Sequence, residues 1–283
     1  MRRTLYGGEY FDPAATLGCG QAFRWERTQD GFWVFAQDRA CLLRREGEST
    51  VLECEEGDLA FFENYFDLAR DYAAINARVC AFGIPRLSAA ARFGRGIRIL
   101  NQGAEETIFS FIISQNNNIP RIRGILSRLC EALGGERAFS GRTFRAFPSA
   151  EALAGQGEAF YRSIGCGYRA PYLAKTAGIL ASAGTAGLYA LPSPQLREAL
   201  LRLPGVGPKV ADCILLFAFH RTSAFPVDVW MEKAYRSLGG TVCGREKIAS
   251  ACAEKFGALG GYVQQYLFYF EREGYEYGSH NDC

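Results

Sequence analysis

The stretch Leu203-Pro204-Gly205-Val206-Gly207-Pro208-Lys209-Val210-Ala211-Asp212-Cys213 decides the fold. Leucines recur at helical spacing in the residues before it, and Ser193-Pro194 is typical of a helix that starts with serine as its N-cap. Gly205 and Gly207 permit a tight turn, because glycine adopts backbone conformations that other residues avoid. Pro208 suits the first position of a second helix, where a missing N–H costs little. The sequence therefore predicts a helix, a glycine turn and a second helix.

The second predicted helix begins with a lysine and continues as a largely apolar run, which indicates burial. Free amide groups at a helix N-terminus bind phosphate, and a neutral lysine amine is a nucleophile that forms Schiff bases. Asp228 follows Pro226 and is a predicted N-cap of a third helix that ends at Gly239-Gly240. Taken singly, a lysine in a helix is in most proteins a solvated surface charge, and an aspartate before a helix is in most proteins only a cap. The specific signal is the combination of Lys209 with Asp228 at this spacing.

Composition bounds the class of protein. The chain has 283 residues, of which 48% are hydrophobic and 22% charged, enough for two or three compact units. The net charge of +2 and the isoelectric point near 8.0 are only weakly basic, so any surface for nucleic acid must be local. Eight arginines are candidates for such a surface, each with a solvated helix face as the alternative: Arg92, Arg95, Arg98, Arg121, Arg123, Arg128, Arg162 and Arg169.

Cysteine and histidine usage narrows the chemistry. The ten cysteines form no C-x-x-C pair, so neither a zinc finger nor a thioredoxin-like site is indicated. Two histidines supply a metal hydrolase or a histidine general base poorly. The start MRRTLYGGEY has no apolar signal segment, and no run is long enough to span a membrane. We expect a monomer in a reducing cytoplasm, associated with the nucleoid if the source is prokaryotic.

The pattern along the chain predicts an α+β protein. Residues 1 to about 56 are typical of strands and turns, with a hairpin at Asp30-Gly31 and a further pair of strands near 41–43 and 50–52. This predicts a small antiparallel sheet with one packed face. Helical spacing begins after Gly57, and loops and short helices are expected from 136 to 161. We predict an N-terminal sheet domain with flanking helices at 1–92. An all-helical region at 93–283 follows, with the helix-hairpin-helix at about 194–218.

Four further segments carry polar or aromatic groups suited to a nucleic acid. Asn116 begins three consecutive asparagines at a helix junction, which form either a capping loop or a polar finger that fills a vacated base position. Tyr168 and Arg169 lie on a glycine-rich loop and are either core residues or a wedge and a base contact. Gly20 is a plain turn glycine or offers its carbonyl to a ligand. Gln264 and Phe268 share one helix face, suited to a base edge and its ring.

Together these segments resemble the 8-oxoguanine DNA glycosylase/AP lyase family of the helix-hairpin-helix Gly/Pro-Asp superfamily, from about Gly20 to Phe268. The resemblance implies a base-excision repair enzyme that flips 8-oxoguanine out of duplex DNA, opposite cytosine, and excises it. The abasic strand would then be cut by β-elimination through a lysine Schiff base. The alternatives are a glycosylase of the same fold for another damaged base and a non-catalytic DNA-binding protein.

The resemblance also assigns roles to residues. The catalytic residues would be Lys209, as nucleophile, and Asp228, which stabilises positive charge on the sugar. The damaged base would be held by Gly20, Cys213, Phe217, Pro226, Gln264 and Phe268. The wedge and the contacts to the estranged base would be Asn116, Arg121, Tyr168 and Arg169. DNA phosphate would be bound by Gly205, Val206, Gly207 and Trp230.

Three positions depart from the animal members of that family. Trp230 stands where they have histidine, Phe217 where they have methionine, and Pro120 where they have a small residue. These changes affect the fine geometry of the pocket rather than the reaction. Cys243 and Cys252 do not make the four-cysteine cluster of the iron–sulfur relatives. No cofactor and no catalytic metal are expected, and the resemblance allows a structural cation at the hairpin phosphate site.

Overall fold

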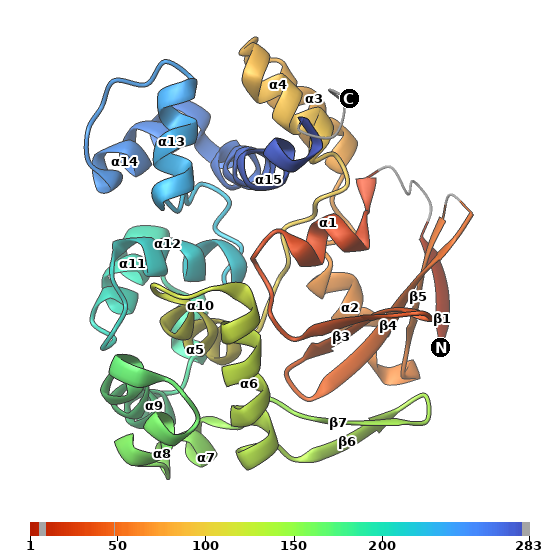
Figure 1. Cartoon of the computed structure of the whole chain (residues 1–283), viewed down its shortest axis with the longest axis vertical. Helices are drawn as coiled ribbons and strands as arrows, with labels where there is room; N and C mark the ends of the chain where they lie inside the picture. The colour runs from red at the N-terminus through yellow and green to blue at the C-terminus, as the bar shows by residue number, and fades with distance from the viewer. Residues whose placement is uncertain (6–9, 48, 279–283) are drawn as a thin grey trace.

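The structure, a computed structural model, describes residues 1–5, 10–47 and 49–278, with side chains up to residue 273. Its N-terminal part is a five-stranded antiparallel sheet in the order β1-β5-β4-β3-β2 (Figure 1). The strands are β1 (Arg2–Leu5), β2 (Trp25–Thr28), β3 (Gly31–Ala36), β4 (Arg39–Glu46) and β5 (Ser49–Cys54). The predicted hairpin is confirmed, since Thr28 pairs with Gly31. Only glycine fits at position 31, because an added Cβ would lie 2.2 Å from the Leu43 carbonyl oxygen.

Both faces of this sheet are packed, so the expectation of a single packed face is wrong. One face, which includes Val34 and Leu43, packs with Phe62 of α2 (Leu59–Tyr65). The other face carries Trp33 and Phe35, which alternate with the first set along β3. Its cover is a second hairpin of β6 (Glu136–Phe139) and β7 (Arg142–Arg145), in a region predicted to be loops and short helices. Figure 1 shows this hairpin running beneath the sheet.

The rest of the chain is helical. A short helix, α1 (Pro13–Gly18), also interrupts the region predicted as strands, because the Asp12 side chain accepts from the Ala15 amide at 3.1 Å and caps it. The other helices are α3 (Tyr72–Cys80), α4 (Pro85–Phe93), α5 (Ala104–Ser114), α6 (Ile119–Leu133), α7 (Ala150–Ala154), α8 (Glu158–Ser163), α9 (Ala170–Ala183), α10 (Ala186–Tyr189), α11 (Ser193–Leu201), α12 (Pro208–Phe217), α13 (Val229–Ser237), α14 (Arg245–Phe256) and α15 (Gly260–Gly278). The predicted fold class is confirmed.

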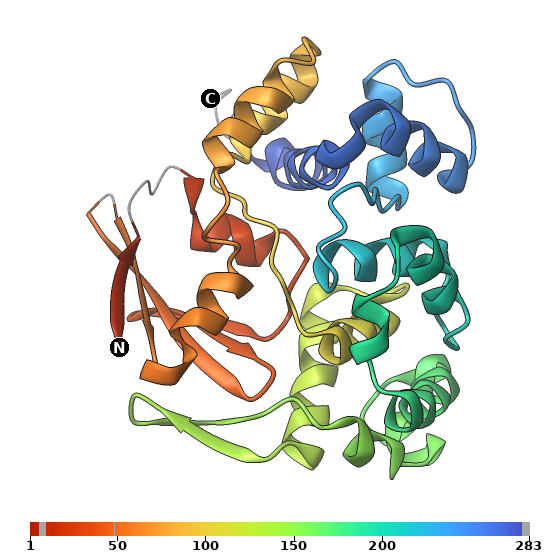
Figure 2. The same ribbon diagram turned by 180° about the vertical axis from the view of Figure 1, so that it is seen from behind.

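One hydrophobic core joins the helices from both halves of the sequence. α15 packs against α4, α13 and α14, and Tyr72 of α3 meets Tyr262 of α15 at 5.6 Å between ring centroids. Figure 2 shows α3 and α4 beside α15 at one end of the molecule. These two helices end by Phe93 but share the core of the later helices, and the division into 1–92 and 93–283 stays a prediction. Among the described residues, no helix is both long and apolar enough to cross a membrane.

Candidate active site and nucleic-acid interface

The predicted helix-hairpin-helix is formed by α11, a turn and α12. Gly205 has φ +82°, and a Cβ added to it would lie 2.7 Å from the Tyr172 Cβ, so both conformation and space require glycine. Its carbonyl accepts a hydrogen bond from Gln115 Nε2 at 2.8 Å, which ties the turn to the end of α5. α11 starts at Ser193 with Pro192 as its N-cap, one residue before the predicted start.

The N-terminus of α12 is open. Gly207 is the N-cap, and an added Cβ there would have no atom within 4 Å. No side chain of the described residues caps this helix, so its first amides lack the partner that a cap would supply. Val206 is buried and fixes the turn from inside. The two predicted glycines therefore differ, since Gly205 is required by the fold and Gly207 leaves space in front of free donors.

Lys209 lies in the first turn of α12 and is half-buried. Its Nζ is 5.4 Å from the centre of the Phe111 ring, and that ring stacks on Phe217 with centroids 5.5 Å apart. Cys213 follows Lys209 by one helical turn on α12, so the two side chains share one face of the helix. Burial raises the pKa of the Cys213 thiol to about 11, although the Lys209 amine opposes that rise. The thiol is therefore protonated at neutral pH.

Asp228 caps the next helix, as predicted. Its Oδ1 accepts a hydrogen bond from the Met231 amide at 2.9 Å, at the start of α13. The carboxylate is close enough to Cys213 to raise the pKa of that thiol further. Val227, which precedes Asp228 in the chain, lines a cavity of about 260 Å³ together with Lys209. Lys209, Cys213 and Asp228 thus come close together, whereas the cavity that Lys209 lines is otherwise formed by Val227 and by residues of α12 and α14.

The resemblance assigns Gly20 and Phe268 to the same base pocket, and the structure brings these distant residues together. Gly20 has φ +82°, and an added Cβ would lie 3.5 Å from Phe268 Cε1 and 3.3 Å from Arg272 Nη1. Gln264, one turn before Phe268 on α15, is buried and accepts a hydrogen bond from the Gln265 side chain at 3.0 Å. We call the residues around Gly20 the glycine loop. This loop and α15 form two adjoining walls of the predicted base pocket.

Gln21 fixes the loop next to Gly20. Its Nε2 donates to the Arg98 carbonyl at 2.7 Å, and its Oε1 accepts from the Leu100 amide at 2.9 Å. The Gln21 side chain is fully buried. The position of the Gly20 carbonyl is therefore set by the segment that leads into α5. Pro226, the remaining residue predicted to contact a base, is buried in the segment between α12 and α13.

Asn116, Tyr168 and Arg169 also come together. Asn116 has φ +46°, a left-handed conformation, and its Nδ2 donates to the Tyr168 hydroxyl at 3.2 Å. Tyr168 is 49% exposed, whereas Arg169 is only 2% exposed. The Arg169 guanidinium donates to the carbonyls of Asn116, at 3.1 Å, and Gln115. In this arrangement Arg169 supports the asparagine loop from beneath, and Arg121, at the start of α6, is the exposed arginine nearby.

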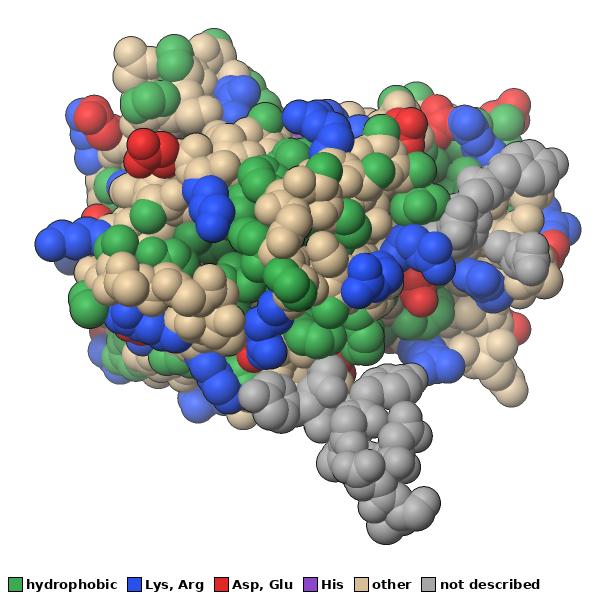
Figure 3. All heavy atoms as spheres, turned by 90° about the horizontal axis from the view of Figure 1, so that it is seen from above, with side chains coloured by type: hydrophobic (Ala, Val, Ile, Leu, Met, Phe, Trp, Pro, Cys, Tyr) green, Lys and Arg blue, Asp and Glu red, His purple; other side chains and the backbone are tan. Residues whose placement is uncertain are grey.

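Other predicted basic and aromatic residues divide between structure and surface. Arg98 is buried and donates to carbonyls that include Phe66 at 2.8 Å, while Arg123 and Arg128 bind the carbonyls of Trp25 and Ile164. These three arginines therefore hold the fold together. Trp230, in the first turn of α13, is 39% exposed, and its ring lies beside the Lys233 amine. Figure 3 shows basic side chains scattered, with apolar ones between them, over the end of the molecule that carries α15.

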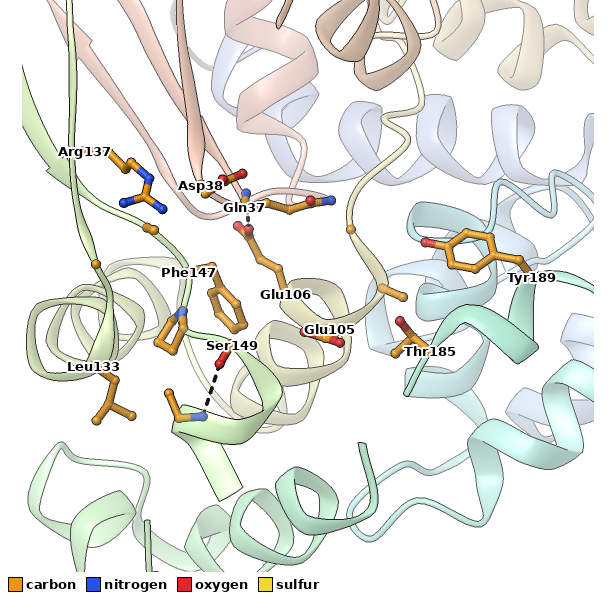
Figure 4. Close-up of a pocket in the computed structure, with 16 residues that line it drawn as sticks. Gln37, Asp38, Glu105, Glu106, Leu133, Arg137, Phe147, Ser149, Thr185 and Tyr189 are labelled. Carbon is orange, nitrogen blue, oxygen red and sulfur yellow. Dashed lines mark hydrogen bonds between the residues drawn. The ribbon is translucent and has the colours of Figure 1, made fainter. Parts of the chain in front are cut away.

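A larger cavity, of about 530 Å³, lies elsewhere and contains none of the predicted site residues. Figure 4 shows Glu105 and Glu106 of α5 on its wall, across from Tyr189. The Glu106 carboxylate is engaged by Arg24 at 3.1 Å and by the Gln37 amide at 2.8 Å. The charge of the Glu106 carboxylate is therefore compensated within the protein. This cavity lies between the sheet and the helices.

Sequence reasoning missed one ion pair beside Lys209. Asp212 lies one turn further along α12, lines the cavity of Lys209 and pairs with Arg197 Nε at 2.7 Å. Burial raises the pKa of Asp212 even though Arg197 opposes it. An acidic residue inside an apolar helix was the available signal, because a buried carboxylate needs a partner. Among the described residues, no group of three or more metal-binding side chains could hold an ion.

Two family models match the chain. The model of the 8-oxoguanine DNA glycosylase N-terminal domain matches residues 5–108. The model of the HhH-GPD superfamily base excision DNA repair protein matches residues 109–257. The N-glycosylase/DNA lyase OGG1 of Arabidopsis thaliana is 33% identical over 287 positions, which cover 90% of this chain and 76% of that protein.

Solved structures agree with these matches. The 8-oxoguanine glycosylase/lyase of Clostridium acetobutylicum, in complex with double-stranded DNA containing cytosine opposite 8-oxoG, has a TM-score of 0.89 and 36% identity. The match covers 94% of this chain and 93% of that one. MBOgg1, in complex with a low affinity DNA ligand, has a TM-score of 0.91 and 34% identity, over 96% of each chain.

Proposed function

This chain belongs to the 8-oxoguanine DNA glycosylase family of the HhH-GPD superfamily, and we propose that it excises 8-oxoguanine from duplex DNA and then cuts the abasic strand with Lys209 as the nucleophile. It is a bifunctional glycosylase and AP lyase, and double-stranded DNA is its partner. The observation that carries the proposal is the position of Lys209. This lysine lies at a helix end with free donors, and its amine and the Asp228 carboxylate both act on the thiol of Cys213.

The reaction begins when the neutral Lys209 amine attacks C1′ of the flipped nucleotide. The bond from Nζ to C1′ forms as the bond from C1′ to the base breaks, and the departing base keeps that electron pair and takes up a proton. Asp228 supports this step, since its carboxylate faces the positive charge that develops on the sugar. Opening of the sugar gives a Schiff base. Loss of a proton from C2′ then expels the 3′ phosphate.

Recognition of the lesion rests on the walls formed by the glycine loop and α15. Oxidation places a hydrogen on N7, and the Gly20 carbonyl would accept it, whereas guanine has no donor there. In a buried pocket this difference is worth about 1–3 kcal/mol. Phe268 would stack on the ring and Gln264 would contact its edge, in keeping with their positions one turn apart on α15. Cys213, Phe217 and Pro226 would complete the pocket.

The asparagine loop would fill the position that the flipped base leaves. Asn116 and Tyr168 are joined by a hydrogen bond and Tyr168 is exposed, so both can enter the duplex together. The exposed Arg121 would contact the estranged cytosine. We assign Arg169 the support of this loop, through its bonds to main-chain carbonyls, as well as the predicted base contact.

Phosphate binding falls to the turn between α11 and α12. The amides near Gly207 are directed to an open helix end, and a phosphate there gains from the helix dipole. Trp230 lies at the N-terminus of α13, where a second phosphate can bind. A structural cation at this hairpin and a monomeric state remain predictions, which metal analysis of the DNA complex and sedimentation would check.

Borohydride trapping tests the proposal. The protein should become covalently linked to duplex DNA that contains 8-oxoguanine opposite cytosine, and Lys209→Gln should abolish the product. Trapping that survives Lys209→Gln would remove this lysine from its role. A panel of duplexes with other oxidised or alkylated bases distinguishes a different base specificity, and binding without strand cleavage would indicate a non-catalytic protein.

A further inference from the structure

The face of α15 that carries Gln264 and Phe268 has a third member. Arg272 follows Phe268 by one helical turn, so these three side chains form a row along the helix. The Arg272 guanidinium lies 5.3 Å from the centre of the Phe268 ring, within the range of a cation–π contact. Its Nη2 donates to the Gly18 carbonyl. One side chain therefore contacts both walls of the base pocket.

Arg272 and Gln21 hold the glycine loop from its two sides. Gln21 ties the residue after Gly20 to the segment that leads into α5, as described above. Arg272 binds the last residue of α1, Gly18, two residues before Gly20, and its Nη1 lies 3.3 Å from the position of a Cβ on Gly20. Without Arg272, the carbonyl at the end of α1 would lose its link to α15, and the Phe268 ring would lose the group that lies over it.

We propose that Arg272 is a specificity-determining positioning residue, which sets the gap between the Gly20 carbonyl and the Phe268 ring so that the oxidised base is held at hydrogen-bond distance. This inference rests on the proposed function. A hydrogen bond weakens steeply outside its normal geometry, and a misplacement of about 1 Å can cost 10²-fold in rate. A small shift of the loop therefore removes the contact that separates 8-oxoguanine from guanine.

The position of the guanidinium favours this role over that of a surface charge. The Arg272 side chain is 20% exposed, and Nε pairs with the neighbouring Glu273 at 2.8 Å. That pair orients the planar group so that Nη2 is directed to the Gly18 carbonyl while its face remains near Phe268. Lysine could keep the charge and one donor, but it has no plane to lie over an aromatic ring.

Two substrates separate positioning of the base from general damage. Excision of 8-oxoguanine needs the base pocket, whereas cleavage of DNA that already contains an abasic site needs Lys209 but no seated base. In single-turnover assays, Arg272→Ala should lower 8-oxoguanine excision about 10²-fold while abasic cleavage stays within about threefold of the parent protein. The rate of 8-oxoguanine excision by Arg272→Lys should lie between those of Arg272→Ala and the parent protein, since lysine keeps a donor for Gly18. Arg78→Ala, which removes an exposed arginine from α3, is the matched control and should leave both rates unchanged.

The outcomes are distinct. If Arg272→Ala excises 8-oxoguanine as fast as Arg78→Ala does, or if excision and abasic cleavage fall together with thermal stability, Arg272 has no positioning role. If the parent protein cuts abasic DNA but does not excise 8-oxoguanine, the proposed function fails, and the inference about Arg272 fails with it. A loss confined to excision, with partial rescue by lysine, supports the assignment.

Discussion

Replacing each glycine of the hairpin by alanine should separate the needs of the fold from those of DNA binding. At Gly205, the left-handed backbone adds about 1–2 kcal/mol of strain, and the 2.7 Å approach of a new Cβ to Tyr172 adds about 1–3 kcal/mol. Reduced freedom of the unfolded chain returns about 0.4–1 kcal/mol. The net cost of Gly205→Ala is about 2–4 kcal/mol, which lowers the melting temperature on the order of 5–10 °C.

Gly207→Ala should behave in the opposite way. Its φ of −89° suits any residue and the added Cβ meets no atom within 4 Å, so the cost should be limited to the poorer N-cap preference of alanine, about 0.5–1 kcal/mol. The methyl group would nevertheless stand where a phosphate approaches the amides. Loss of one hydrogen bond to a charged group, about 1.5 kcal/mol, weakens binding roughly tenfold.

Thermal unfolding gives the first quantity, and fluorescence anisotropy with a duplex that carries an uncleavable abasic analogue gives the second. The parent protein is the reference for both variants. The reasoning is refuted if Gly207→Ala is as destabilised as Gly205→Ala, or if Gly207→Ala binds this duplex as tightly as the parent protein does.

Two substitutions and one labelling experiment test the site and the core. Asp228→Asn keeps a good N-cap, so the melting temperature should hardly change, while single-turnover excision should fall about 10²–10³-fold; equal loss of both would contradict the charge-stabilising role. Because the pKa of the Cys213 thiol is about 11, iodoacetamide should label it far more slowly at pH 8 than a free cysteine, and mass spectrometry would reveal fast labelling if this is wrong. Burial alone would raise the pKa of Asp67, but its contacts with His220 and Arg70 outweigh burial and lower it. The folded carboxylate therefore stabilises the protein above the unfolded pKa of about 4, and this contribution is lost as the pH falls through the folded value. Asp67→Asn should lower the melting temperature at pH 7 and weaken its acid dependence, and an unchanged acid limb would contradict this.

Local sequence signals predicted the helix-hairpin-helix correctly. Elsewhere the signals were weak, and one strand hairpin and one short helix were missed. Gly205 and Pro208 specify a turn and a helix start by their own stereochemistry, so neighbours in sequence suffice. The strands of the β6–β7 hairpin have little alternation of their own. They form because Phe139 packs on Trp33 at 5.6 Å between centroids, a contact far away in sequence. The helix at Pro13–Gly18 is too short to show periodicity, although Asp12-Pro13 is a recognisable start.

The site was predictable to a similar extent. Lys209 and Asp228 lie in one continuous motif, whereas no pattern of spacing brings Gly20 to Phe268, and only the resemblance to a family paired them. The buried guanidinium of Arg169 could not be foreseen, because its partners are main-chain carbonyls that carry no sequence signature. The pair of Arg197 and Asp212 was missed for a related reason, since it joins two helices that the turn folds together.

The union of Gly20 with Phe268 has a consequence during protein synthesis. Chains emerge from the ribosome with the N-terminal part first, and domains fold as units once their sequence is out. Gly20 and Lys209 both emerge before α15 does. A chain that lacks α15 therefore has Gly20 but not the Phe268 wall that lies beside it. The two walls meet only when α15, made last, packs against α3 and α4.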